Sequence, residues 1–416
     1  MALRRLSSLR SLKSPRRAAL LVLLAGASPL SGEDVLRLPI GDPARRDRDA
    51  PVVLDAITDT ESGRMLLPTE LPARLRDVRL LLVGEEHTAM ETHEVERRVI
   101  EELDKAGRRV SIGLEMFPYT QQPALDEWSA GRLSEEEFLR TSQWYRHWGY
   151  NWGYYRAVFL YAREHGLAML AVNAPREVVT AVRRKGFEGL TPEEAAHIPT
   201  RIDTKSADHM RLFRASFTDA TFHAGMSEEA WQAMLAAQCT WDATMAFHAV
   251  SPVLREADPK AIVVVLAGTG HVQYGLGIER QARQWYAGRI ASVLPVAVAD
   301  EKGVPVGSAR ASYASFLWGI PAESAPLFPD LGIATRAAEG GPGLEILHVE
   351  EDSVGARGGL AVGDVLVSID GVALTDRETL ARAMAGKRWG DGVSLGVRRR
   401  EETVTRMVPL RRRARP

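Results

Sequence analysis

The stretch LLLVGEEH, residues 80–87, decides the fold of the larger part of this chain. Four apolar residues, enough for a buried strand, change abruptly to glycine and charged residues. The same change occurs at three more places: residues 110–114 before Glu115, 168–172 before Asn173, and 262–267 before GTGH at 268–271. Continuous apolar strands alternating with helical patterns predict an α/β fold, a mainly parallel sheet flanked by helices, here with a helical subdomain.

The polar residues that follow these runs are expected to meet, because the carboxyl ends of parallel strands lie at one edge of a sheet. They offer a set of nitrogen and oxygen ligands: Glu85, Glu86, His87, Glu115 and His271. Two histidines with carboxylates suit zinc, manganese or ferrous iron. His93 is expected in the first turn of the next helix, facing the same edge. Glycines at 84, 268 and 270 would let the chain turn tightly there.

A structural interpretation of the same residues stays open. A single histidine or glutamate at a strand end is often a helix cap or a hydrogen-bonded structural residue. None of the spacings is that of a zinc finger or of an H-E-x-x-H helix. The convergence of four strand ends, rather than any one residue, is what favours a site.

A second unusual stretch, residues 144–155, holds a high density of aromatic residues: Trp144, Tyr145, Trp148, Tyr150, Trp152, Tyr154 and Tyr155. Flat apolar rings with polar tips suit the face of a porphyrin, and tyrosine or histidine can bind haem iron. His147, Tyr150 and Tyr154 are therefore the candidates for cofactor binding. Alternatively, most of these rings pack the helical subdomain onto the sheet.

A long helix is predicted after Ser227, a favourable N-cap residue. Its residues at three- and four-residue steps form one face: Trp231, Leu235, Gln238, Asp242 and Met245. Asp242 on this face could orient a metal-binding histidine or could satisfy backbone amides, and both roles remain open.

The N-terminus has the layout of a secretory signal. Basic residues precede a short apolar run at residues 18–24, and Ala25-Gly26-Ala27 offers a cleavage site. We expect a signal peptide over residues 1–27 and a linker over 28–50; the alternative is a basic tail beside a buried apolar segment. No later run of eighteen apolar residues predicts a transmembrane segment in the mature chain.

Length and charge narrow the function. The 416 residues are enough for two or three domains, and the net charge of −1 without a basic stripe argues against nucleic acid as a partner.

Five motifs together resemble the ChaN family of haem-binding uptake proteins, which belongs with the Tiki-like proteases and erythromycin-esterase-like proteins in one superfamily. They are GEEH at 84–87 with His93, LEMF at 114–117, NAPR at 173–176, QCTWDATM at 238–245 and GTGHV at 268–272. The resemblance covers roughly residues 52–320 of an expected domain at 51–320. It implies a site carried by Glu85, His87, Glu115 and His271, with His93, Asn173, Arg176 and Asp242 nearby.

The C-terminal part resembles a PDZ domain of the kind attached to bacterial exported proteases. Prolines mark a linker over residues 321–327, and the motifs LGI at 331–333, GDVL at 363–366 and IDG at 369–371 follow within residues 328–412. The resemblance implies that a peptide adds a strand to the sheet edge and that the loop of Leu331, Gly332 and Ile333 captures its terminal carboxylate. A PDZ fold that only packs on its neighbour is the alternative.

Two classes of function remain. The chain could be an exported, periplasmic or otherwise extracytoplasmic carrier of haem or iron, whose PDZ domain docks to protein C-termini. It could instead be a metal-dependent hydrolase, a peptidase or esterase, with the ion on His87 and His271 and with Glu85 or Glu115 activating water. The motif resemblance and the aromatic stretch favour the carrier.

Overall fold

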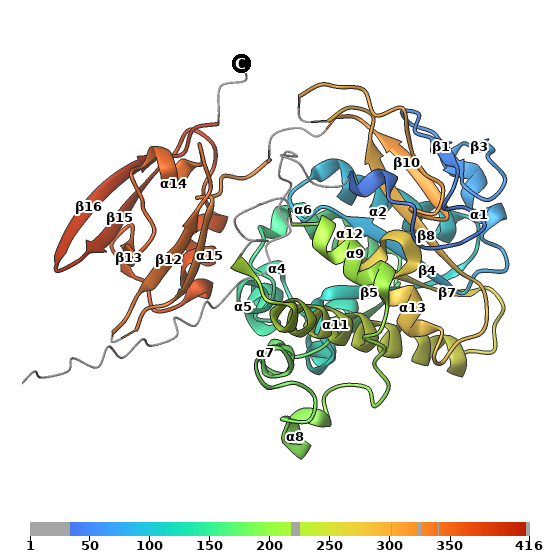
Figure 1. Ribbon diagram of the computed structural model, residues 1–416, viewed down its shortest axis with the longest axis horizontal. Coiled ribbons are helices and arrows are strands. Elements are labelled where there is room, and N and C mark those ends of the chain that lie inside the picture. The colour runs from blue at the N-terminus through green and yellow to red at the C-terminus, as the bar shows by residue number, and fades with distance from the viewer. Residues whose placement is uncertain (1–33, 218–224, 301, 323–325, 340, 413–416) are drawn as a thin grey trace, which may run out of the picture.

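A computed structural model describes residues 34–217, 225–300, 302–322, 326–339 and 341–412, which form two lobes (Figure 1). The larger lobe is an α/β domain and the smaller, C-terminal lobe is built mainly of antiparallel strands. The predicted signal peptide, residues 1–27, lies outside the described residues. Within the described ranges, no helix is both long and apolar enough to cross a membrane.

The large domain is organised around an eight-stranded sheet with the order β3-β2-β10-β8-β4-β7-β5-β6. Its strands are β2 (Ile57–Asp59), β3 (Met65–Leu66), β4 (Leu80–Glu85), β5 (Arg109–Pro118), β6 (Ala168–Asn173), β7 (Ala261–Gly268), β8 (Ile290–Ala297) and β10 (Phe316–Ile320). The six strands from β10 to β6 are parallel, whereas β2 and β3 pair antiparallel at one edge. The mainly parallel sheet is confirmed, and β8 and β10 extend it beyond the four expected strands.

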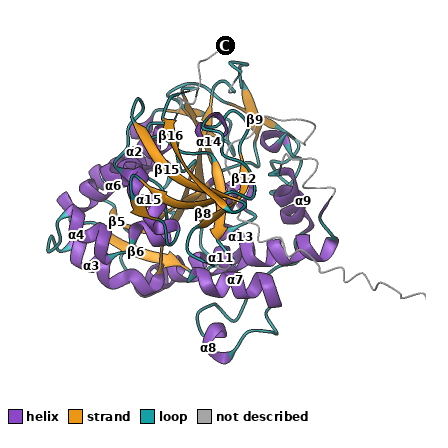
Figure 2. Ribbon diagram, turned by 90° about the vertical axis from the view of Figure 1, so that its left-hand side faces the viewer, coloured by secondary structure: helices purple, strands orange, loops and turns teal. Residues whose placement is uncertain are grey.

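Helices cover both faces of this sheet (Figure 2). They are η1 (Val35–Arg37), η2 (Pro68–Glu70), α1 (Leu71–Arg74), α2 (Met90–Lys105), η3 (Tyr119–Gln121), α3 (Gln122–Ser129), α4 (Glu135–Thr141), α5 (Trp144–His147), α6 (Trp152–Glu164), α7 (Arg176–Lys185), α8 (Pro192–Ala195), α9 (Ala207–Ala215), α11 (Glu228–Arg255), α12 (Thr269–Val272), η4 (Gln273–Gly275) and α13 (Ile278–Ala282). Alternate side chains of each strand enter separate cores, one under α2, α3 and α6 and the other under α11 and α13. Both faces of the sheet are therefore buried, which explains why the strand sequences are apolar without interruption.

Local sequence signals place the two longest helices. In α2, Val95, Val99 and Leu103 are buried on one side, as their spacing predicts. Ser227 caps α11 by accepting a hydrogen bond of 3.2 Å from the amide of Ala230. The predicted face of α11 is buried, including its two polar members, so these must find partners in the protein interior.

The packed structure begins earlier than expected. Within the predicted linker of residues 28–50, η1 forms a short turn, and Leu38 and Ile40 are buried in the core beneath α11. Strand β1 (Asp49–Pro51) pairs with β9 (Ser308–Arg310). These pieces are only three residues long and have no steady period, so their pairing with a strand 260 residues away leaves no local pattern.

Two of the site glycines are required by space rather than by turn geometry. None of Gly84, Gly268 and Gly270 has a positive φ, so the strand exits do not use the left-handed conformation that glycine allows. A Cβ atom at Gly84 would lie 2.1 Å from a methyl group of Leu294, and one at Gly268 would lie 3.0 Å from the His87 ring. A larger residue at either position would have to displace the side chain of Leu294 or of His87.

The small domain is a six-stranded sheet, β11-β12-β13-β15-β16 with β14 on β13. Its elements are β11 (Ile333–Ala337), β12 (Leu344–Val349), α14 (Val354–Arg357), β13 (Val365–Ile369), β14 (Val372–Ala373), α15 (Arg377–Ala385), β15 (Gly392–Arg399) and β16 (Glu402–Pro409). It has its own apolar core, which includes Leu344, Leu366 and Val397. Strand β11 lies at one edge of the sheet beside α15, and the PDZ resemblance implies that a peptide strand adds to such an edge.

The two domains contact each other through residues 144–155, which we call the aromatic segment. Helix α15 packs against α5 (Figure 1). Asn151 donates a hydrogen bond of 3.0 Å to the carbonyl of Ala385, and Phe328 packs edge-on against Tyr154 at 5.0 Å between ring centroids. The aromatic segment therefore joins the C-terminal domain to the sheet.

Candidate functional site

The structure brings the four predicted strand-end residues to the carboxyl edge of the parallel strands. Glu85 is the last residue of β4 and His87 follows it by two positions. Glu115 lies near the end of β5, and His271 lies in α12 directly after β7. Neighbouring strands β4, β7 and β5 therefore present them side by side.

Glu85 holds His87 in place. Nδ1 of His87 lies 2.8 Å from Oε1 of Glu85, and the hydroxyl of Tyr155 donates to the same oxygen at 3.2 Å. Nε2 of His87 makes no hydrogen bond with any residue that the structure describes, and 19% of this side chain is exposed. A carboxylate on one ring nitrogen and an open second nitrogen is the arrangement that orients a histidine for iron or zinc.

His93 is buried behind this pair. Its Nδ1 lies 3.0 Å from Glu85 and 2.9 Å from Glu96, and its Nε2 lies 3.3 Å from the backbone oxygen of His87. Burial disfavours the charged ring, but the two carboxylates outweigh this and raise the pKa of His93 to about 10. His93 therefore supports His87 from the protein side.

His271 is held from both sides. Its Nδ1 lies 2.6 Å from Oδ1 of Asp242 and 3.0 Å from the side-chain amide of Gln238, both on α11. Its Nε2 lies 3.3 Å from Glu115, whose other oxygen accepts a hydrogen bond of 2.6 Å from the amide of Gly268. Of the two roles left open for Asp242, the geometry shows the contact with histidine.

The four residues form two adjacent pairs, Glu85 with His87 and Glu115 with His271. They meet at Gly268, where His87 and Glu115 both lie within 4 Å of the position that a Cβ atom would occupy. Among the described residues, the tight buried groups of potential metal ligands are Glu85–His93–Glu96 and His209–Cys239–Asp242, and the two-pair arrangement is not one of them. Each carboxylate is already engaged by a histidine.

Charge pairing sets the protonation of this edge. Burial would raise the pKa of Glu115, but His271 and His87 outweigh it and lower that pKa below its ordinary value. Glu115 and Asp242 raise the pKa of His271 to about 10 against the effect of burial. Glu96 is the exception, because burial and the neighbouring Glu85 raise its pKa to about 8.

The aromatic candidates differ in what they contact. Tyr150 is half-buried with its ring 4.7 Å from that of His87, and its hydroxyl makes no hydrogen bond with a described residue. The hydroxyl of Tyr154 is taken by the amide of Phe328 at 3.2 Å. His147 lies on α5, with a buried Nε2 that has no partner in the structure. Of these three candidates, only Tyr150 has its ring against that of His87. The Trp148 ring lies beside it, 4.8 Å from the His87 ring.

The two nearby residues of β6 and α7 have separate roles. Asn173 donates a hydrogen bond of 2.8 Å to the backbone oxygen of Glu115, and it therefore fixes the end of β5. Arg176 begins α7 at the same edge and is exposed.

A second buried cluster lies behind Asp242. His209 and Cys239 come within 3.7 Å, but the guanidinium of Arg280 lies 3.1 Å from His209 and 3.5 Å from the sulfur. Burial and Arg280 lower the pKa of His209 to about 3, and burial raises that of Cys239 to about 12. Arg280 thus already supplies the positive charge in this cluster.

The predicted peptide-binding loop carries an internal carboxylate. Gly332 has a φ of +65°, and its amide donates to Oδ1 of Asp330. Leu331 is buried, and its carbonyl accepts from Gly355. The loop is therefore formed, with one of its amides facing a carboxylate of the chain itself.

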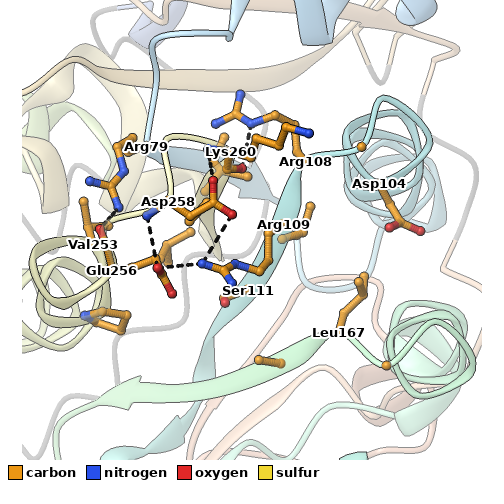
Figure 3. A pocket seen from close by; sticks show the side chains of 18 of the residues that line it. Arg79, Asp104, Arg108, Arg109, Ser111, Leu167, Val253, Glu256, Asp258 and Lys260 are labelled. Carbon is orange, nitrogen blue, oxygen red and sulfur yellow. Dashed lines mark hydrogen bonds and ion pairs between the residues drawn. The ribbon is translucent and has the colours of Figure 1, made fainter.

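A cavity of about 700 Å³ lies at the opposite, amino edge of the strands (Figure 3). Its charged residues satisfy one another and the backbone. Arg108 donates to the carbonyls of Leu75, Val78 and Lys260, and Arg109 pairs with Glu256 at 2.6 Å. We interpret the charged residues that line this cavity as a network that stabilises the junctions between strand starts and helix ends.

Sequence reasoning missed three residues of the site. Glu96 follows His93 by one helical turn on the buried face of α2, a spacing that could have indicated the contact. Tyr155 belongs to the aromatic segment and Gln238 to the predicted face of α11 and to the motif at 238–245, but neither position indicates the contact with Glu85 or His271. Their contacts join elements far apart in sequence, which no local pattern records.

Comparison with known proteins gives two matches to family profiles. The family described as "Haem-binding uptake, Tiki superfamily, ChaN" matches residues 71–281, half of the chain. The family described as "PDZ domain" matches residues 329–410. A ChaN structure, "Cofacial heme binding to ChaN of Campylobacter jejuni", is 17% identical with a TM-score of 0.47, and the match covers 63% of this chain and 95% of that one.

Other similar proteins match only part of the chain. The PDZ domain of HtrA3 with a phage-derived ligand is 24% identical over 20% of this chain and 83% of its own, with a TM-score of 0.18. The protein RETICULATA-RELATED 5, chloroplastic, from Arabidopsis thaliana is 24% identical over 188 residues. That match spans 44% of this chain but only a quarter of the curated relative's length.

Proposed function

Because the chain belongs to the ChaN family of haem-binding uptake proteins and carries a C-terminal PDZ domain, we propose that it is an exported haem-binding protein whose PDZ domain docks to the C-termini of partner proteins. Haem supplies the iron and the flat apolar ring when it is bound. The residues of this chain orient that ring, bind its iron and keep water from it.

The observation that carries the proposal is the environment of His87. Its Nδ1 is fixed by Glu85, its Nε2 is open, and its ring contacts those of Trp148 and Tyr150, which also contact each other. An oriented imidazole with flat apolar neighbours fits a porphyrin iron. In the proposed complex His87 binds iron through Nε2, while Tyr150 contacts the ring.

The second pair supports the first. Glu115, His271 and Asp242 form a buried, hydrogen-bonded row that fixes the backbone at Gly268, directly beside His87. Loss of His271 would leave two buried carboxylates without their cation, which is costly. We therefore expect the two histidines to act as a unit, although only His87 contacts the ligand.

Titration of haemin into the purified mature protein tests this proposal. His87→Ala and His271→Ala should each remove most binding, and the double variant should lose little more, because their effects are not additive. His165→Ala, which breaks an exposed pair with Asp104 at the other edge of the sheet, is the control. Normal haemin binding by a folded double variant would refute the shared site.

The same variants distinguish the carrier from a hydrolase. Titration with Zn²⁺, Mn²⁺ and Fe²⁺, followed by peptide and ester hydrolysis assays, would reveal a metal enzyme if metal binding and hydrolysis disappear together. We favour the carrier because Glu85 and Glu115, the candidate bases, are both engaged by histidines.

The proposal that the protein is exported rests on the N-terminal pattern of basic, apolar and small residues. The mature form should begin near Ser28 and should be found outside the cytoplasm. N-terminal sequencing of the extracytoplasmic protein tests this, and an intact Met1 there would contradict it.

A further inference from the structure

The buried group of Glu85, His93 and Glu96 lies directly behind His87. Glu85 ends β4, and His93 and Glu96 lie one turn apart on the inner face of α2. All three residues are 2% exposed or less, and one potential ligand atom from each lies within 4.8 Å of the other two. Charges enclosed in this way must be balanced by groups inside the protein, because bulk water does not reach them.

The two ring nitrogens of His93 have different surroundings. Nε2 lies 3.3 Å from the backbone oxygen of His87, which can accept its hydrogen. Nδ1 faces two carboxylates, at 3.0 Å from Glu85 and 2.9 Å from Glu96. Histidines that bind metal ions usually donate the hydrogen of the other ring nitrogen to a backbone oxygen or a carboxylate. The orientation of His93 is therefore suitable for a metal ligand that binds through Nδ1.

A proton on Nδ1 satisfies this group only in part. The hydrogen bond of Nδ1 goes to Oε2 of Glu96. Oε2 of Glu85 lies at nearly the same distance from Nδ1, but it is buried and has no hydrogen-bond partner in the part of the chain that the structure describes. Oε1 of Glu96 is buried in the same condition. Unsatisfied buried carboxylate oxygens are costly, so a cation that contacts both carboxylates at once would stabilise the fold.

A divalent metal ion fits these requirements. Zinc binds nitrogen and oxygen ligands at about 2.0–2.2 Å, which places neighbouring ligands about 3 Å apart. The separations of 2.9 and 3.0 Å between Nδ1 of His93 and the two carboxylates agree with this value. Two carboxylates and a neutral imidazole carry two negative charges, which one divalent ion balances. Nitrogen and carboxylate ligands of this kind suit Zn²⁺, Mn²⁺ or Fe²⁺.

The second tight group of potential ligands, on α9 and α11, lacks this need for a cation. It already contains the guanidinium of Arg280, 3.1 Å from His209 and 3.5 Å from the sulfur of Cys239. In contrast, the hydrogen bonds and ion pairs that Glu85 and Glu96 form within the described ranges go only to histidines and to Tyr155. The group behind His87 is therefore the better candidate for a metal ion.

We propose that Nδ1 of His93 and one carboxylate oxygen from each of Glu85 and Glu96 bind a divalent transition-metal ion in a closed, structural site. The ion replaces the proton that Nδ1 carries in the metal-free chain. The rings of Tyr154 and Tyr155, 5.8 and 4.5 Å from that of His93, help to enclose it.

The proposed ion would act on His87 through Glu85. It holds Oε2 of Glu85, while Oε1 of the same carboxylate stays 2.8 Å from Nδ1 of His87. A carboxylate fixed from behind orients the histidine more firmly, whatever ligand His87 itself binds. The buried position leaves no open coordination position for a substrate, in contrast to catalytic metal sites.

Metal content of the full mature chain tests this site. Because the site is buried, the chain is unfolded with a chelator, refolded, and dialysed with Zn²⁺ or Mn²⁺ before elemental analysis. The wild-type chain should retain the ion at an equimolar ratio. Glu96→Gln keeps the shape of the side chain but removes its charge, and it should weaken binding about tenfold or more. Glu102→Gln makes the same change elsewhere on α2 and should bind as the wild-type chain does.

His87→Ala separates this site from the strand-end pairs. It removes the open nitrogen that a metal hydrolase would use but none of the three proposed ligands, so this variant should retain the ion. Loss of the ion in His87→Ala, with normal binding by Glu96→Gln, would place the ion on the strand-end pairs and overturn the proposal. A wild-type chain that refolds and retains neither Zn²⁺ nor Mn²⁺ would also overturn it.

Anomalous diffraction from crystals of the zinc-loaded wild-type chain needs no variant. It should locate the ion about 2.0–2.1 Å from Nδ1 of His93. Zinc bound only at another place would refute the site. Neither measurement involves haem, so a failure of the proposed haem binding and a failure of this metal site are distinguishable.

Discussion

Arg108 illustrates how one side chain can stabilise a junction of several elements. Its guanidinium donates hydrogen bonds of 2.7 to 2.9 Å to three backbone carbonyls, at Leu75, Val78 and Lys260. The carbonyls of Leu75 and Lys260 also accept backbone hydrogen bonds, from Val78 and Arg109, so the guanidinium adds a charged donor to a junction that the backbone itself begins. Arg109, the next residue, instead forms an exposed ion pair with Glu256.

Neighbouring arginines should therefore differ sharply in their effect on stability. Arg108→Met should lower the free energy of unfolding by about 2 kcal/mol or more, because carbonyls lose a charged donor. Arg109→Met should cost less than about 1 kcal/mol, as exposed pairs do. Urea unfolding measures both, and equal losses would contradict this account.

Glu96 should make the protein less stable in alkali. Its pKa is raised from 4.5 to about 8, so between these values the folded state keeps a proton that the unfolded chain has lost. The free energy of unfolding should therefore fall as the pH rises through this window. His93 and His271, whose pKa values are raised from 6.5 to about 10, act in the same direction above pH 6.5.

Replacing Glu96 isolates its share of this effect. Glu96→Gln should flatten the decline in unfolding temperature between pH 5 and pH 8, and Glu102→Gln on the same helix should not. Thermal unfolding at several pH values provides the measurement. An unchanged pH profile in Glu96→Gln would show that the carboxyl is already ionised in the folded state.

At the scale of elements, the sequence predicted what repeats locally and missed what depends on distant contacts. The four apolar runs became β4, β5, β6 and β7 because a strand buried on both faces must be apolar throughout. The edge strands β2 and β3 are two or three residues long and pair antiparallel, so they leave no such signal.

For the candidate site too, the sequence predicted what depends on local patterns and missed what depends on distant contacts. Strand ends predicted that Glu85, His87, Glu115 and His271 share one edge, because parallel topology alone brings them there. The sequence could not predict their pairing, since it depends on Tyr155 from α6 and Asp242 from α11 meeting that edge. The assignment of these four residues to ligand binding remains a prediction.

The loop before β11 should control which peptides the PDZ domain accepts. The carboxylate of Asp330 already receives the amide of Gly332, one of the donors expected for a peptide C-terminus. Asp330→Asn removes a negative charge from this position, and it should tighten binding of a free apolar C-terminus up to about fivefold. Fluorescence anisotropy with free and amidated peptides provides the measurement.

The amidated peptide is the control for this loop. It should bind more weakly than the free peptide, and its affinity should not change with Asp330→Asn. Equal binding of both peptides to the wild-type chain would show that the loop does not capture a carboxylate.

At the scale of the whole molecule, the aromatic segment is what makes two domains one unit. Its inner side touches the histidines, through Tyr150 on His87 and Tyr155 on His93 at 4.5 Å. Its outer side receives the PDZ domain through Asn151 and through Phe328 at the start of the PDZ region. Any ligand that orders this segment also stabilises the docked arrangement, because both depend on the same side chains.

Gly153 in α6 provides the sharpest test of this docking. A Cβ atom there would lie 2.3 Å from the ring of Phe328, so Gly153→Ala must displace that ring. Overpacking of this kind costs about 1–3 kcal/mol, and the linker should be cleaved by protease about tenfold faster or more, where cleavage follows the open population. The double variant Gly153→Ala Phe328→Ala is the control: it should keep the α/β domain folded and should not add to the loosening caused by Phe328→Ala alone. Cleavage at the wild-type rate in Gly153→Ala, with an unchanged radius of gyration in solution scattering, would show that the PDZ domain is not held through Phe328.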